Sequence, residues 1–229
     1  MARPAEEERT APRVLACWVP DWLRLSLRRE DLFLPQLRAA YRTARDDGAR
    51  LRLMFPMVTD ISEFARAARA ARRVQAELGA PDIPLGVMVE IPACAVAVDR
   101  FAEHADFLSI GTNDLAQYLT ATSRTNPVLA HDTDPLHVAL LRTVHAVASV
   151  GAAAGIPVSA CGGLAGDPVG AIVLAALGVT SLTVALPALP EVRDALGRTD
   201  AAVLATVRTH ALATGGHRLR HLVARLTDL

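Results

Sequence analysis

The sequence predicts an α/β fold, a partial (β/α)8 TIM barrel with about five strand–helix units. Short apolar runs alternate with segments of helical periodicity along most of the chain. The runs are apolar on both faces, which is typical of parallel strands covered by helices. Polar side chains follow several successive runs directly, and barrels characteristically draw their functional groups from the carboxyl ends of several strands.

The first expected elements are a leader, a helix and a strand. Residues 1–13 are polar and charged, and we expect them to form a disordered leader before one domain over residues 14–229. Residues 25–47 have the spacing of a helix. Residues 51–55 form a short apolar run that ends at a proline, which predicts the first strand of the alternation.

The middle of the chain continues the alternation. Asp60 is placed to cap a helix in which Ile61, Phe64, Ala68 and Ala71 share one face. The elements expected after it are a strand at 85–91, helical residues to about 104, a strand at 107–110, a long helix at 135–154 and a strand at 158–161. A glycine-rich loop, a helix at 169–177, a fifth strand at 181–185, helical residues at 191–213 and a basic tail complete the chain.

A doubly wound sheet also satisfies this alternation. The dinucleotide-binding pattern GxGxxG is absent, and the glycine-rich segment 162–166 does not match it. We therefore favour the barrel, although five strands do not close an eight-stranded one. The strands at 51–55 and 181–185 would each leave an edge open, and we expect residues 14–19 or another chain to cover one of them.

Composition excludes several classes of function. Of the 229 residues, 52% are hydrophobic and 21% are charged, and 24 basic residues balance 24 acidic ones. A net charge of zero argues against bulk attraction to nucleic acid or to an anionic membrane. The three cysteines show no CxxC spacing, which argues against a disulfide framework or a zinc site.

The chain shows no sign of export or membrane insertion. Glu6, Glu7 and Glu8 stand where a signal peptide would need an apolar core. Arg142 and His145 interrupt the longest apolar stretch. We expect a cytoplasmic protein that binds neither membranes nor nucleic acid.

Two carboxylates follow neighbouring predicted strands. Glu90 comes directly after four apolar residues, and Asp114 lies just beyond the next strand. Adjacent strands lie about 5 Å apart, so both carboxylates can reach one metal ion. Oxygen ligands with open positions for substrate favour Mg²⁺. Taken singly, Glu90 could instead pair with a basic residue, and Asp114 could cap the following helix.

Two further residues are candidates for chemistry. Arg124 lies beyond the helix that starts near Asp114, where a guanidinium can bind phosphate with two hydrogen bonds, although most of the basic residues are simply solvated. Cys161 ends a strand before Gly162 and Gly163, which should expose its thiol at the mouth of the site. Such a cysteine can be a nucleophile, a proton donor or an inert residue.

Four ordered segments resemble one family. They are LRLMFPM (51–57), GVMVEIPA (86–93), SIGTNDL (109–115) and CGGLAGD (161–167). They resemble the C-terminal, phosphoenolpyruvate-binding domain of enzyme I, the phosphoenolpyruvate–protein phosphotransferase (a kinase) of the bacterial sugar phosphotransferase system. Pyruvate phosphate dikinase and phosphoenolpyruvate synthase are relatives. The resemblance runs from about residue 23 to about residue 196, and it implies a barrel of the phosphoenolpyruvate/pyruvate type.

The resemblance implies a role for each candidate residue. Glu90 and Asp114 would hold Mg²⁺ with oxygens of phosphoenolpyruvate. Asn113 would hydrogen-bond the substrate, and Arg124 would bind its phosphate. Cys161 would protonate the enolpyruvate carbon as the phosphoryl group leaves. Metal and arginine would neutralise charge in a loose phosphoryl-transfer transition state.

The sequence also departs from the family. From the resemblance we expect the upstream phosphohistidine domain and the first three barrel strands to be absent. Asp21 replaces an arginine that binds phosphate in the family, and Gly163 replaces a glutamate. These departures imply weak or absent turnover by the isolated chain and suggest a separate phosphohistidine-domain protein as partner. Family members dimerise through this domain, which makes a homodimer plausible.

Three functions fit these residues. The first is the phosphoenolpyruvate-binding component of a phosphotransferase. The second is a non-catalytic module that binds phosphoenolpyruvate or pyruvate. The third is a Mg²⁺-dependent lyase that stabilises an enolate, which we rank last because Asn113, Asp114, Arg124 and Cys161 together fit enzyme I better.

Overall fold

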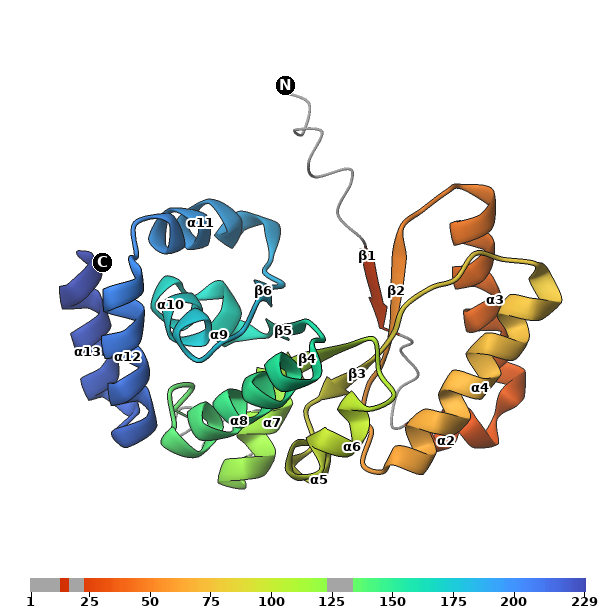
Figure 1. The fold of residues 1–229 in the computed structure, drawn as a ribbon, viewed down its shortest axis with the longest axis horizontal. Coiled ribbons are helices and arrows are strands. Elements are labelled where there is room, and N and C mark those ends of the chain that lie inside the picture. Colours follow the sequence, from red (N-terminus) through yellow and green to blue (C-terminus); the bar gives the residue numbers. More distant parts are fainter. Residues whose placement is uncertain (1–12, 17–22, 123–133) are drawn as a thin grey trace.

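The sheet of this protein is parallel and follows the order of the chain. The computed structural model describes residues 13–16, 23–122 and 134–229 (Figure 1). In this part of the chain six strands pair in the order β1-β2-β3-β4-β5-β6. They are β1 (Arg13–Ala16), β2 (Leu51–Phe55), β3 (Leu85–Val89), β4 (Phe107–Gly111), β5 (Val158–Cys161) and β6 (Ser181–Leu182).

Helices connect successive strands and surround the sheet (Figure 1). They are α2 (Leu23–Arg28), α3 (Glu30–Asp46), α4 (Ile61–Leu78), α5 (Pro92–Val96), α6 (Val98–Ala102), α7 (Thr112–Thr120), α8 (Val138–Ala154), α9 (Gly163–Gly166), α10 (Pro168–Ala176), α11 (Leu189–Gly197), α12 (Ala201–Ala213) and α13 (Gly216–Thr227). A 3-10 turn, η2, covers Leu186–Ala188. A doubly wound sheet would reverse its strand order, whereas a barrel keeps it sequential. The predicted partial TIM barrel is therefore confirmed.

The N-terminal strand was anticipated as an edge cover. Arg13 pairs with Leu51 and Ala16 pairs with Met54, both in parallel register. This confirms the expectation for residues 14–16, while residues 17–22 lie outside the described part. Arg13, which we had assigned to the leader, belongs to β1; residues 1–12 also lie outside it. In the described chain β1 and β6 each pair on one side only, so the barrel remains open.

Several expected boundaries were wrong. The helix expected at 25–47 is two helices, because the backbone at Arg29 leaves the helical region (φ −115°, ψ 68°) while the apolar spacing continues across the break. The helical stretch at 191–213 is likewise divided into α11 and α12. The strand expected at 181–185 pairs only at Ser181–Leu182. The basic tail forms a helix, α13.

Local sequence explains where α4 begins and ends. The Asp60 side chain accepts a hydrogen bond from the backbone N–H of Ser62, and the Glu63 side chain completes a capping box. Gly79 adopts the left-handed conformation that closes the helix (φ 57°). Arg24 of α2 pairs with Glu63 and bonds Thr59, which ties α2 to the start of α4. The predicted cap at Asp60 is therefore confirmed.

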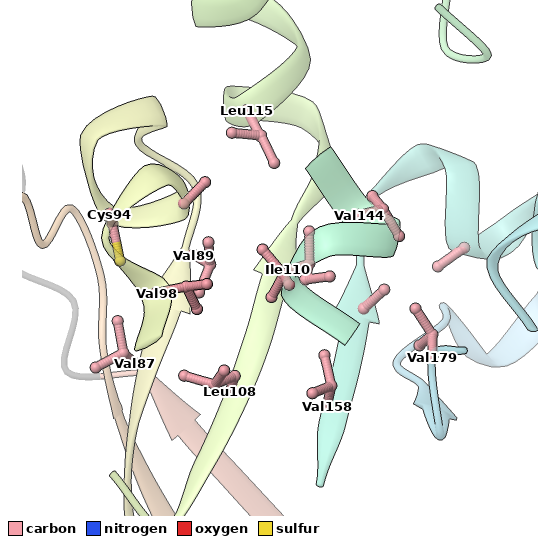
Figure 2. Packing of buried hydrophobic residues seen from close by; sticks show 14 of the residues in the cluster. Val87, Val89, Cys94, Val98, Leu108, Ile110, Leu115, Val144, Val158 and Val179 are labelled. Atoms are coloured by element: carbon pink, nitrogen blue, oxygen red, sulfur yellow. The ribbon is translucent and has the colours of Figure 1, made fainter. Parts of the chain in front are cut away.

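The main core lies between the outer face of the sheet and the helices. Figure 2 shows Val87, Leu108 and Val158 of three adjacent strands packed with Val98 and Val144 of the helices that cover them. Successive strand residues point to opposite faces, so the residues between these positions face the barrel interior.

The interior face of β4 and β5 carries small or polar side chains toward the carboxyl ends of these strands. Ser109 is level with Ser159, and Gly111 is level with Cys161. Functional groups therefore emerge on this face toward the carboxyl ends of the strands. None of the helices in the described part of the chain is both long and apolar enough to cross a membrane.

Candidate functional site

Glu90 is a buried carboxylate at the carboxyl end of β3. Its residue is 3% exposed, and Val89 before it pairs with Ile110 of β4. A Cβ atom added to Gly111 would lie 2.8 Å from the Glu90 Cβ and 2.9 Å from its Oε2. Gly111 thus leaves the space that the glutamate side chain occupies, which places this carboxylate across the ends of β3 and β4.

The backbone after β2 also holds Glu90. The N–H of Met57 donates a hydrogen bond to Glu90 Oε1 over 2.7 Å. Met57 has a positive φ of 53°, a conformation that costs free energy in a residue with a side chain. The contact joins the first two of the four family-like segments. Sequence reasoning missed this role of Met57, since no local pattern signals a contact between residues 33 positions apart.

Asp114 lies in the first turn of α7, immediately beyond β4. Gly111 is the N-cap and the helix starts at Thr112, so Asp114 is the third helical residue. The structure therefore does not support the alternative that Asp114 is the capping residue. A carboxylate in the first turn is favoured by the helix dipole. Asp114 is partly exposed, so it faces the solvent side of the site.

Cys161 ends β5, and both its burial and the charges of the two carboxylates raise the pKa of its thiol. Burial raises the pKa of the Cys161 thiol, and the negative charge of Glu90 raises it further. A hydrogen bond with Ser109 lowers this pKa, while the charge of Asp114 raises it; the net direction is upward. The thiol therefore stays protonated at neutral pH. Cys161 is partly buried, less exposed than its place before two glycines suggested.

Cys94 provides a contrast within the same neighbourhood. It lies fully buried in α5, and burial together with the charge of Glu90 raises the pKa of its thiol to about 12. Figure 2 shows Cys94 beside Val87, Val89 and Val98 in the apolar cluster. It is thus a core residue, while Cys161 lies at the strand ends.

Asn113 binds the glycine-rich loop. Its Oδ1 accepts a hydrogen bond from the N–H of Gly163 over 2.9 Å. Thr112 Oγ1 donates to the carbonyl oxygen of Cys161 over 2.7 Å. Gly162 has a φ of 102°, and a Cβ there would lie 2.5 Å from Thr112 Oγ1, so this position requires glycine. Because the Asn113 oxygen is occupied, its amide NH₂ is the group that can donate to a ligand.

A cavity of about 340 Å³ opens beside Asn113. Its lining residues come from α7, α8, α9 and the segment before α8: Thr112, Asn113, Ala116, Pro135, Leu140, Gly163 and Leu164. The loop expected at 162–166 contains the short helix α9. The cavity gives a ligand access to the amide of Asn113.

The structure brings together four of the five predicted site residues. Glu90, Asn113, Asp114 and Cys161 meet at the carboxyl ends of β3, β4 and β5. Arg124 and Asp21 lie outside the described residues. Ser109, which contacts Cys161, was missed; strand alternation from Gly111 would have indicated that both face the interior.

The side chains present suit a hard divalent cation better than zinc. No group of three or more His, Cys, Asp or Glu residues within the described ranges is arranged to hold a metal ion. Mg²⁺ differs from zinc because it commonly takes one or two protein carboxylates and fills its other positions with water or phosphate oxygens. Glu90 and Asp114 fit that requirement chemically.

The sequential open barrel with carboxylates at its strand ends defines a member of the TIM-barrel class. Residues 22–201 match the family described as "PEP-utilising enzyme, PEP-binding domain". The chain belongs to this family, as its four segments predicted.

The relatives that this chain matches are longer proteins. A multiphosphoryl transfer protein of Xanthomonas campestris pv. campestris is 50% identical over 173 residues, which cover 76% of this chain and 20% of that protein. A phosphoenolpyruvate-protein phosphotransferase of Mycoplasma pneumoniae is 35% identical over 191 residues, which cover 83% of this chain and 33% of that protein. The chain therefore spans about a fifth to a third of the length of these relatives.

Solved structures share the fold at low identity. A citrate lyase of Burkholderia xenovorans superposes with a TM-score of 0.58 at 18% identity, covering 86% of this chain and 68% of that one. A Haloferax volcanii malate synthase in a magnesium and glyoxylate complex gives 0.55 at 13% identity, covering 85% and 64%. These likenesses support the barrel fold alone.

Proposed function

We propose that this chain is the phosphoenolpyruvate-binding domain of an enzyme I-like phosphotransferase, in which phosphoenolpyruvate phosphorylates a histidine and releases pyruvate. The observation that carries the proposal is the meeting of two carboxylates and a protonated thiol at the ends of three adjacent strands. Family membership supports the substrate, since the matched domain is described as PEP-binding.

In this proposal Glu90 and Asp114 hold Mg²⁺. The bound ion would supply positive charge that offsets the charge on the phosphate and carboxylate oxygens of the substrate. Met57 keeps Glu90 in place through its N–H, and the burial of Glu90 favours pairing with a cation. Asn113 donates from its amide NH₂ to the substrate. Arg124 binds the phosphate, a role that rests on the sequence motif.

Cys161 acts as the acid. As the phosphorus–oxygen bond to the enol breaks, the phosphoryl group bonds to a histidine nitrogen, and the enol oxygen becomes the ketone of pyruvate. The proton of the Cys161 thiol moves to the methylene carbon, which becomes the methyl group. The thiolate then regains a proton from solvent. The raised pKa of Cys161 keeps the proton available at neutral pH.

The acceptor histidine would come from a separate phosphohistidine-domain protein, and the site would be cytoplasmic. We propose weak or absent turnover by the chain alone, because Asp21 replaces a phosphate-binding arginine and Gly163 replaces a glutamate. A homodimer through this domain, as the family resemblance suggests, remains compatible with the open edges of the sheet.

A second candidate is a module that binds phosphoenolpyruvate or pyruvate without turnover. Gly163 favours it: where the family has a carboxylate, this chain offers only a backbone N–H, which already binds Asn113. Both candidates bind the substrate, so only phosphoryl transfer distinguishes them. A Mg²⁺-dependent lyase ranks below both, because the sequence likeness extends over enzyme I motifs while the lyase likeness is limited to fold.

The direct test is calorimetric titration with phosphoenolpyruvate, with Mg²⁺ and with chelator. We expect binding only with Mg²⁺, and at least a ~10-fold loss of affinity in Asn113→Ala, which removes a hydrogen bond to a charged ligand. Equal binding in chelator would contradict the proposal. Pyruvate release by the chain alone, abolished in Glu90→Ala, would overturn the expectation of weak turnover. Transfer to an added phosphohistidine domain would exclude the non-catalytic candidate.

A further inference from the structure

A basic groove lies between the last two helices, α12 and α13. These helices pack side by side at the C-terminal end of the molecule (Figure 1). The groove has a volume of about 580 Å³, within the range of small-molecule sites. Its lining residues are His210, Thr214, Arg218, Leu219, His221, Leu222 and Arg225. All of them lie beyond residue 201, where the family match ends.

The lining of the groove is positively charged. Arg218 and Arg225 are exposed, and neither forms an ion pair with any residue that the structure describes. The described lining contains no acidic side chain. Arg220 on the same helix differs, because it pairs with Asp167 over 2.6 Å and so secures α13 to the segment before α10. The two lining arginines are therefore available to an anion.

The spacing of the cations sets the size of that anion. Arg218 and Arg225 are seven residues apart, which places them about 10 Å apart along one face of the helix. His221 stands between them on the same face and stacks against His217, with ring centroids 4.3 Å apart. A chain of phosphates offers each guanidinium group its own phosphate, whereas a single phosphate would have to be shared by both.

The remaining lining is suited to a ring. Leu222 is partly exposed and gives the groove an apolar floor, while Leu219 belongs to the buried core. His210 on α12 has its Nδ1 bonded to the carbonyl oxygen of Thr206, which makes that nitrogen the donor and leaves Nε2 to face a ligand. An apolar floor with imidazoles beside it and guanidinium groups along one wall matches a heteroaromatic base joined to phosphates.

We propose that the groove between α12 and α13 binds a nucleoside di- or triphosphate, with the phosphates on Arg218 and Arg225 and the base on Leu222 and His221. A nucleic acid fits less well, because a chain with zero net charge offers one compact basic patch in place of an extended track. The site is separate from the acidic strand ends in both its residues and its charge.

The test is calorimetric titration with ATP, tripolyphosphate, AMP and inorganic phosphate, in chelator so that no metal bridges ligand and carboxylates. ATP should bind at least ~10-fold more tightly than AMP or phosphate, with tripolyphosphate between them, because a phosphate chain gives each arginine its own charged partner. The double variant Arg218→Gln/Arg225→Gln should lose at least ~10-fold in ATP affinity.

The matched control is the double variant Arg193→Gln/Arg208→Gln. It removes the same charge from exposed arginines of α11 and α12 that do not line the groove, and its ATP affinity should stay within about twofold. A Glu90→Gln variant should bind ATP as the unmodified chain does. Absence of ATP binding, equal losses in both double variants, a loss in Glu90→Gln, or tighter binding of a single-stranded oligonucleotide than of ATP would each overturn the proposal.

Discussion

The acidic strand ends and the basic α12–α13 groove are built in opposite ways. Glu90, Asp114 and Cys161 come from three different strand–helix units, and the register of the sheet brings them together. The groove is made by two consecutive helices, with its two arginines about two turns apart on α13. A site assembled by a sheet depends on the core beneath it, whereas a groove on a helix pair depends mainly on its own surface residues.

The largest effect is expected from a substitution in the sheet core. Phe55 at the end of β2 is fully buried and packs edge-on against Phe33 and Phe64. Phe55→Ala should lower the free energy of unfolding by about 3–5 kcal/mol. Chemical denaturation measures this. Leu222→Ala, on the partly buried groove floor, should cost much less, and equal costs would contradict the distinction.

A second variant targets the acidic site from within. In Gly111→Ala the new Cβ would overlap Glu90, at 2.8 Å from its Cβ, so the carboxylate must move. We expect a stability cost of about 1–3 kcal/mol from overpacking. Binding of Mn²⁺ as a magnetic probe should weaken while ATP affinity at the groove stays unchanged. Parallel losses at both sites would show that they are not independent.

A third, smaller effect concerns the cap of α4. Asp60→Ala removes the acceptor for the N–H of Ser62 and should lower the free energy of unfolding by about 1 kcal/mol. Thermal unfolding followed by circular dichroism provides the measurement. Asp60→Asn keeps an acceptor and should retain most of the stability. An alanine variant as stable as the original would refute the structural role of this cap.

The smallest expected effect is on the reactivity of Cys161. Because the folded pKa is raised, the reactive thiolate appears only at higher pH, and alkylation of Cys161 should rise later with pH than that of a free cysteine. Glu90→Gln removes one cause of the shift, so the alkylation profile should move to lower pH. Peptide mapping by mass spectrometry separates Cys161 from the buried Cys94. A profile unchanged by Glu90→Gln would contradict the charge coupling.

Much of the fold could be predicted because its signals are local. Apolar runs located β2 to β5 closely, and Asp60 marked the start of α4. The break at Arg29 was missed because helical spacing continues across it. The extent of β6 depends on pairing with β5, which sequence does not display.

The sequence predicted which residues form the site, but it did not predict the contacts between them. Glu90, Asn113, Asp114 and Cys161 follow from strand ends and from the family segments. The support of Glu90 by Met57 and the bond from Gly163 to Asn113 join residues far apart in sequence. The helix α13 was expected as a tail because its charges outnumber the buried residues Leu219 and Val223 that anchor it.

The central claim is that Glu90 and Asp114 together hold the divalent cation that phosphoenolpyruvate requires. Mn²⁺ titration followed by electron paramagnetic resonance tests it most directly, on the unmodified chain, on Glu90→Gln and on Asp114→Asn. The Arg218→Gln/Arg225→Gln variant is the control. We predict that each carboxylate variant loses at least ~10-fold in Mn²⁺ affinity while the control does not. Unchanged Mn²⁺ affinity in Asp114→Asn would contradict the claim.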